Sequence, residues 1–121
     1  MGRRRYVVEF GSGADLHGGD VTKAAQRAVK DAISRSCLCG LVEIIGLKSA
    51  AEMHVEVKIG CPQPAAVNGD EVLAMIPFGT KSLEVVAGGL AARGLNLPAL
   101  GPGDTVVIAV AAVTVYVDVD F

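Results

Sequence analysis

The sequence contains no tryptophan, and aromatic residues make up only 4% of the chain. Because 51% of the residues are nevertheless hydrophobic, a folded core must consist mainly of Val, Ile, Leu and Ala. The sequence also lacks an excess of positive charge, since its formal net charge at pH 7 is −2. Nucleic-acid-binding domains generally carry a basic stripe, whereas the one dense basic cluster here, Arg3–Arg5, is typical of a solvated terminal segment. We therefore expect no nucleic-acid partner.

Long apolar runs and a paired set of cysteines are also missing. The longest uncharged apolar run, Thr105–Val117, is shorter than the roughly 18 residues of a membrane helix, so we expect no membrane partner. The apolar run after the arginines ends at Glu9, which argues against a signal peptide. Cys37, Cys39 and Cys61 show no framework spacing, which predicts reduced thiols and a cytoplasmic location.

Hydrophobic periodicity predicts alternating strands and helices. Asp20 is placed to cap a helix whose apolar residues recur at spacings of three and four, with a charged opposite face. Asn68 is placed to cap a second, shorter helix that Pro77 closes. Alternation and β-branched composition predict strands at residues 6–10, 41–46, 54–59, 83–87 and from 104 onward, with a loop over 94–104.

The final predicted strand decides the architecture, because it is apolar on both of its faces and must be covered on both sides. The chain length predicts one domain, residues 1–121, of the α/β class. We expect a two-layer sandwich in which a mixed four- or five-stranded sheet carries two helices on one face. No segment remains to cover the other face, so we expect another copy of the chain to cover it in a homo-oligomer.

The most unusual stretch of the sequence is Gly11–Asp20, a glycine-rich segment between a predicted strand and a predicted helix. A dinucleotide-binding Gly-x-Gly-x-x-Gly motif would need glycine where Leu16 stands, which argues against that function. The main-chain amides beside the helix N-terminus could instead bind an anion. The residues of this predicted anion or small-molecule site are Gly11, Ser12, Gly13, Gly18 and Lys23.

Asp15 and His17 allow two further interpretations of the same segment. Residues two apart in an extended segment point the same way, so a carboxylate and an imidazole could share one divalent metal ion. Such a site needs a third ligand, for which His54, Cys37 or Cys39 are the candidates. Alternatively, Asp15 and His17 hold each other and the loop backbone in an unusual turn.

The run from Gly11 to Gly18 resembles the GxGxDxHG motif of the "Lin" family of conserved hypothetical proteins, found in bacteria and, with a long N-terminal extension, in plants. The resemblance continues over nearly the whole chain, through residues 20–24, 36–39, 55–60, 77–79 and 112–118. It supports the fold and the choice of site, and it implies no known activity.

Two more distant likenesses imply chemistry. Gly11–His17 is similar to a run in methylerythritol cyclodiphosphate synthase, a trimeric zinc enzyme, which implies metal ligation by Asp15 and His17. Met53–Lys58 followed by Cys61-Pro62 is similar to a lysine-bearing strand of the ring-opening amidohydrolases, cyanuric acid hydrolase and barbiturase. Those enzymes consist of three related units with Ser–Lys pairs, which implies a catalytic Lys58 and a trimer of single units here.

One departure bears on that last likeness. The family serine precedes a Gly-Gly pair, whereas Ala87 precedes Gly88-Gly89 in this sequence. A lysine without a hydroxyl to activate has no evident nucleophile, unless Ser12 serves instead.

Two hypotheses from different classes follow from the sequence. The first is an enzyme or small-molecule site, hydrolase-like, at a subunit boundary. It is formed by Asp15, His17 and the glycines, and Lys23, His54 or Lys58 contributes nearby. Asp15 would orient His17 as general base or ligand. The second is a non-catalytic binding or assembly protein in which the glycine-rich segment only shapes the oligomer.

Overall fold

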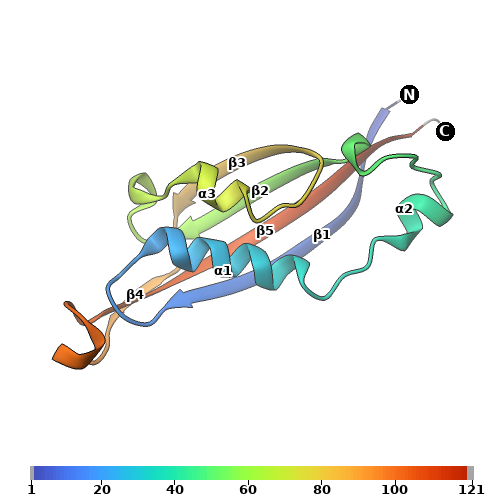
Figure 1. Cartoon of the computed structure of the whole chain (residues 1–121). Helices are drawn as coiled ribbons and strands as arrows, with labels where there is room; N and C mark the ends of the chain where they lie inside the picture. Colours follow the sequence, from blue (N-terminus) through green and yellow to red (C-terminus); the bar gives the residue numbers. More distant parts are fainter. Residues whose placement is uncertain (1, 120–121) are drawn as a thin grey trace.

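The computed structural model describes residues 2–119 and shows a two-layer α/β sandwich with a mixed five-stranded sheet (Figure 1). The strands run in the order β1-β5-β2-β3, and β4 pairs with β5 beyond the end of β2. The elements are β1 (Gly2–Asp15), α1 (Val21–Ile33), α2 (Cys39–Glu43), β2 (His54–Cys61), α3 (Gly69–Leu73), β3 (Thr80–Ala87), β4 (Leu90–Arg93) and β5 (Thr105–Val119). The predicted fold class is therefore confirmed.

The last strand occupies the centre of the sheet. β5 pairs antiparallel with β1 on one side and with β2 and β4 on the other, while β2 and β3 are parallel. Gly88 and Gly89 let the chain cross from β3 to β4 at the end of β2, where a Cβ on Gly88 would lie 3.3 Å from the Cα of Gly60. The central position pairs both edges of β5 with neighbouring strands.

Helix α1 packs on β1 and β5 through an alanine stripe. Asp20 caps the helix, its Oδ1 accepting a hydrogen bond from the Lys23 main-chain N–H at 3.0 Å. Ala24, Ala28 and Ala32 are buried, and their main chain lies against Gly11 and Gly13 of β1. A Cβ on Gly11 or Gly13 would collide with the helix backbone, so these glycines allow the close approach that the alanines predict.

The structure differs from the predicted elements in three places. Strand β1 does not end at Gly11 but continues to Asp15, because the two glycines are accommodated within its pairing with β5. Residues 41–46 do not form a strand, since Cys39–Glu43 form helix α2 and a turn follows. The strand β4 was not predicted, because its four residues lack alternation and are all exposed.

The sheet has a covered face and an open face. The side chains of Val107, Ala109, Ala111, Val113 and Val115 lie in the core beneath the helices, whereas Val110, on the opposite face of β5, is 47% exposed. In Figure 1 the labelled helices lie on the same side of the sheet. Within residues 2–119, no helix is long and apolar enough to span a membrane.

Candidate functional site

Asp15, at the end of β1, is the one charged side chain in the described core, with only 6% of its surface exposed. Its Oδ2 accepts a hydrogen bond from the Asp20 main-chain N–H at 2.8 Å, and its Oδ1 lies 3.8 Å from Arg27 Nη1. The same Arg27 nitrogen donates to the Ala14 carbonyl at 2.6 Å. Asp15 therefore ties the end of β1 to the start of α1.

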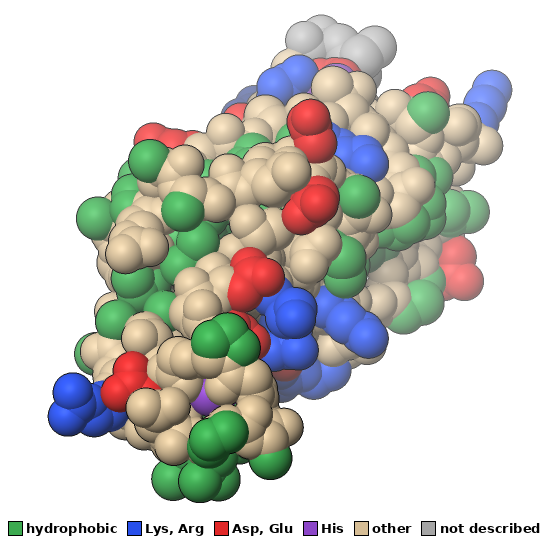
Figure 2. Space-filling view, turned by 60° about the vertical axis from the view of Figure 1, so that its left-hand side comes forward, with side chains coloured by type: hydrophobic (Ala, Val, Ile, Leu, Met, Phe, Trp, Pro, Cys, Tyr) green, Lys and Arg blue, Asp and Glu red, His purple; other side chains and the backbone are tan. Residues whose placement is uncertain are grey.

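His17 contacts a different segment of the chain. Its Nε2 lies 2.8 Å from the Gly101 carbonyl oxygen, so that nitrogen donates the hydrogen bond. Gly101 belongs to the loop between β4 and β5, which carries a short 3-10 helix at Pro98–Leu100. This loop projects from one end of the molecule with exposed leucines, visible as a hydrophobic tip in Figure 2. Asp15 and His17 thus bind main-chain groups of two different segments, and no hydrogen bond joins them to each other.

The main-chain amides that the sequence places around an anion are partly occupied by the chain's own carboxylates. The Ser12 N–H, on the free edge of β1, donates to Asp31 Oδ2 at 3.0 Å. The Lys23 N–H is taken by the Asp20 cap. Gly11 and Gly13 lie inside the strand beneath α1, which corrects their expected place in an open loop. Gly18 remains in the turn, with φ of 97° that favours glycine.

The hydrogen bond between Ser12 and Asp31 also changes the pKa of the Asp31 carboxyl group. The hydrogen bond from the Ser12 N–H, and next that from Arg35, lower the pKa of Asp31 below its ordinary value of 3.8. Asp31 carries its negative charge at neutral pH. A charged group at the edge of β1 discourages pairing with a strand of another chain.

The structure does not bring the suggested metal ligands together within one chain. His54 lies at the start of β2, opposite Tyr116, whereas Asp15 lies opposite Val107 near the other end of β5. His54 Nε2 is instead 2.9 Å from Asp118 Oδ2. Among residues 2–119, no group of three His, Cys, Asp or Glu side chains is placed to hold a metal ion.

Lys58 lies on the open face of the sheet, whereas Asp15 points toward the helix layer. The Lys58 Nζ is 3.5 Å from Glu84 Oε1 on the neighbouring strand β3. The side chains of Lys58 and Glu84 are both more than half exposed. Together they border a shallow depression of about 340 Å³, whose other polar side chains come from Glu56, Ser82 and Thr114. Ser82 and Thr114 carry hydroxyl groups that the sequence motifs did not identify. These two residues become neighbours of Lys58 only through strand pairing.

Next to this polar depression, the open face carries an apolar patch. Its exposed members are Val8 and Phe10 of β1, Val110 of β5 and Leu90 of β4, and Phe10 has 75% of its surface exposed. Ile108 and Ala112 lie between them on β5 and are partly buried. We call these six residues the open-face patch.

The cysteines fall into two environments. Cys61 is buried at the end of β2, and this burial raises the pKa of its thiol. Cys37 and Cys39 are exposed. Both border a cavity that lies on the helix side of the sheet.

Comparisons with known proteins agree with this fold. A solved crystal structure of an FtsZ-like protein of unknown function from Nostoc punctiforme PCC 73102 is 44% identical to the chain, with a TM-score of 0.89. The alignment covers 98% of both chains. No curated protein matches the sequence. The model of a family of conserved hypothetical proteins, the Lin0512 family, matches residues 5–115, and the chain belongs to this family.

Proposed function

We propose that this member of the Lin0512 family is a subunit of a homo-oligomer, a trimer, whose sheet faces meet and enclose a binding site for a small polar molecule. The observation that carries the proposal is the adjacency of the open-face patch and the polar depression around Lys58. Burying apolar surface favours association. In a closed ring of three copies, each subunit can cover part of the open face of its neighbour.

The trimer has its support in the likeness to ring-opening amidohydrolases, in which three related units make one enzyme. Three copies of a single unit would replace three fused ones. The open-face patch supplies the apolar contacts, and the depression beside it becomes shielded from water.

The polar side chains of the depression limit the ligand class. Lys58 donates hydrogen bonds, whereas the carboxylates of Glu56 and Glu84 accept them. When a subunit covers them, these charges need partners, because buried unpaired charges are costly. A cyclic amide or imide offers carbonyl oxygens to the lysine and N–H groups to the carboxylates, and is therefore the ligand class that we propose.

A hydrolytic reaction is the second candidate function. Ser82 and Thr114 share the depression with Lys58, so the open face carries hydroxyl groups beside a lysine although Ala87 replaces the serine of the amidohydrolases. Lys58 would act as the base that activates one of these hydroxyls. Turnover of a cyclic amide that Lys58→Met abolishes would support this reaction, and binding without turnover would reject it.

In this proposal Asp15, His17 and the glycines support the fold. Asp15 holds the start of α1, and His17 holds the loop between β4 and β5. The main-chain partners of both side chains support this role over ligation of a metal or an anion.

The assembly is tested by light scattering of the Phe10→Asp variant. Phe10 is the most exposed member of the open-face patch, so an aspartate there should dissociate the oligomer without unfolding it. Ile44→Asp is the matched control, because Ile44 is 84% exposed but follows α2 on the helix side. An unchanged mass for Phe10→Asp would contradict the proposed interface.

The binding site is tested by thermal shift with a panel of cyclic amides and imides. We expect a ligand to raise the Tm of the wild-type protein and not that of Lys58→Met. Lys30→Met, on the exposed face of α1, is the control that should keep the response. A ligand response that survives Lys58→Met would contradict the role of the depression.

A further inference from the structure

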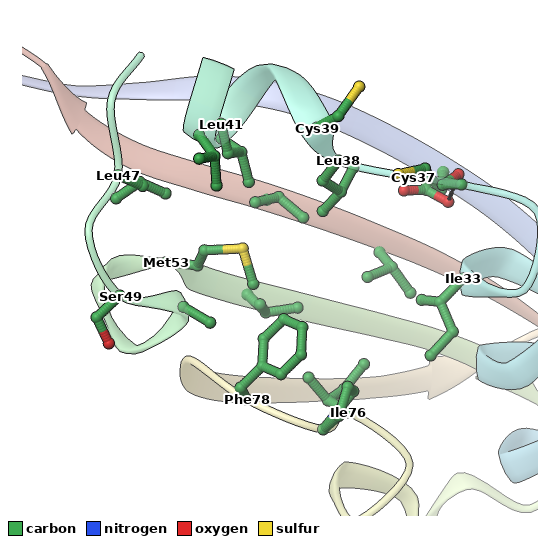
Figure 3. Close-up of a pocket in the computed structure, with 18 of the residues that line it drawn as sticks. Ile33, Cys37, Leu38, Cys39, Leu41, Leu47, Ser49, Met53, Ile76 and Phe78 are labelled. Atoms are coloured by element: carbon green, nitrogen blue, oxygen red, sulfur yellow. Dashed lines mark hydrogen bonds between the residues drawn. The ribbon is translucent and has the colours of Figure 1, made fainter. Parts of the chain in front are cut away.

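The helix side of the sheet contains a cavity of about 570 Å³ that no motif in the sequence marks. It exists because α1 ends at Ile33, whereas β1 and β5 continue beyond it. Past that point the sheet is covered by the segment between α1 and β2, whose one α-helix, α2, has five residues, and by residues 76–78 before β3. The cavity lies between this cover and the strands (Figure 3).

The cavity wall is predominantly aliphatic. Val55, Val113 and Val115 form the floor on β2 and β5, and each is buried. In Figure 3, Leu38 and Leu41 point into the cavity from the cover, opposite Phe78. Volumes of this order are typical of small-molecule sites, which are mainly apolar with a few polar groups that fix the ligand's orientation.

Charged side chains occur at two separate places on this wall. Glu9 lies beside Ser36, whose hydroxyl donates a hydrogen bond to its Oε2. Lys48 belongs to the other end of the cover, where Leu47 and Ser49 lie in Figure 3, across the cavity from Cys37. The Lys48 main-chain N–H donates a hydrogen bond to Glu52 Oε2 at 2.9 Å, and within residues 2–119 the Lys48 ammonium forms no ion pair.

This arrangement selects for a molecule with an apolar body and one anionic end. The aliphatic wall has no row of donors and acceptors that would match a sugar or a nucleobase. A negative group is attracted by Lys48 at one end and repelled by Glu9 at the other, so its orientation is fixed. We propose that the cavity binds an aliphatic monocarboxylate, with the hydrocarbon chain against the valines and the carboxylate at Lys48. This site lies on the opposite side of the sheet from the open-face patch, so it does not depend on the proposed function.

Direct binding tests the ligand class. Decanoate, decanol and decylamine share one hydrocarbon chain and differ in the charge of the head group. We expect isothermal titration to show saturable binding of decanoate, with decanol weaker and decylamine weakest. Lys48→Glu should weaken decanoate binding by about tenfold or more and improve that of decylamine, whereas Lys30→Glu should change neither. No saturable binding of decanoate, or an order of affinities that Lys48→Glu leaves unchanged, would overturn the proposal.

Steric blocking tests the location. Val42 borders the cavity and is 65% exposed, so Val42→Trp should narrow the cavity and weaken decanoate binding without loss of stability. Ile44→Trp is the matched control, because Ile44 is exposed but does not border the cavity. Equal effects of the two tryptophans would overturn the assignment of binding to this cavity.

Thiol modification gives a readout that does not depend on affinity. In a Cys39→Ser variant, N-ethylmaleimide should modify Cys37 quickly, and decanoate should slow that reaction several-fold, while buried Cys61 stays unmodified throughout. A Cys37 that resists modification before ligand is added would overturn the proposal, because it would mean that another part of the protein or a second copy already covers the cavity.

Discussion

Gly13 lies directly against Ala28, and a Cβ on Gly13 would collide with the Ala28 main-chain nitrogen. The same collision occurs at Gly11, one turn further along α1, against the backbone of Ala28 and Ala32. The first half of the glycine-rich motif is therefore explained by helix–sheet packing. Gly11 and Gly13 allow the helix to lie close to the strand. This packing explains why glycine occurs at both positions, without a bound ligand.

Replacement of Gly13 by alanine tests this packing. The added methyl group meets backbone atoms that cannot move without displacing α1, so we expect a loss of about 1–3 kcal/mol or more in the free energy of unfolding. Gly2→Ala is the control, because nothing lies within 4 Å of a Cβ at that position. Urea denaturation measures both, and a stable Gly13→Ala protein would refute the packing role.

Asp15→Ala tests the second half of the motif. Removing the carboxylate leaves the Asp20 N–H without its partner, which we expect to cost about 1–3 kcal/mol of stability. Asp15→Asn keeps an acceptor oxygen and should recover most of that loss. If Asp15 instead ligates a metal with His17, zinc would raise the Tm of the wild type and of neither Asp15→Asn nor His17→Ala.

Asp31→Asn tests the pH dependence of stability. The folded state lowers the pKa of Asp31 below 3.8, first through the Ser12 N–H and then through Arg35. A lowered pKa means that the charged form stabilises the fold above pH 3.8 and that this contribution is lost as the pH falls through the folded value. The wild type should therefore be more stable than Asp31→Asn at pH 7, with the difference shrinking below about pH 4. A constant difference in denaturation experiments across this range would contradict the assignment.

Gly40→Ala tests how the cover of the helix-side cavity is attached. Gly40 is buried in α2, and a Cβ there would overlap the Tyr6 hydroxyl. We expect Gly40→Ala to lower stability, and we expect Tyr6→Phe to relieve part of the loss when the two changes are combined. A double-mutant cycle measures the interaction energy between the two substitutions. Strictly additive changes in stability would show that the Cβ at position 40 and the Tyr6 hydroxyl do not clash.

The amphipathic parts of the fold could be predicted from the sequence. The Asp20 cap with its alanine stripe predicted α1, and alternation predicted β2 and β3. The extension of β1 to Asp15 could not be predicted from its glycines, because only the alanines of α1 make glycine favourable inside that strand. The strand β4 was missed because its pairing with β5 depends on the crossing at Gly88.

The candidate sites were predicted less completely. Asp15 and His17 stand out in the sequence, yet their hydrogen-bonding partners are main-chain groups, one of them 84 positions away, that no local pattern reveals. Lys58 was identified, but its neighbour Glu84 comes from strand pairing. The helix-side cavity was missed because the apolar residues of its cover, such as Leu38 and Leu47, follow neither the period of a helix nor that of a strand.

The mass of the protein in solution tests the central claim most directly, because the proposed site needs a second subunit over the open-face patch. Sedimentation equilibrium at micromolar concentration should give a mass three times that of the 12.4 kDa chain. A monodisperse monomer that keeps its native circular dichroism spectrum would contradict the account.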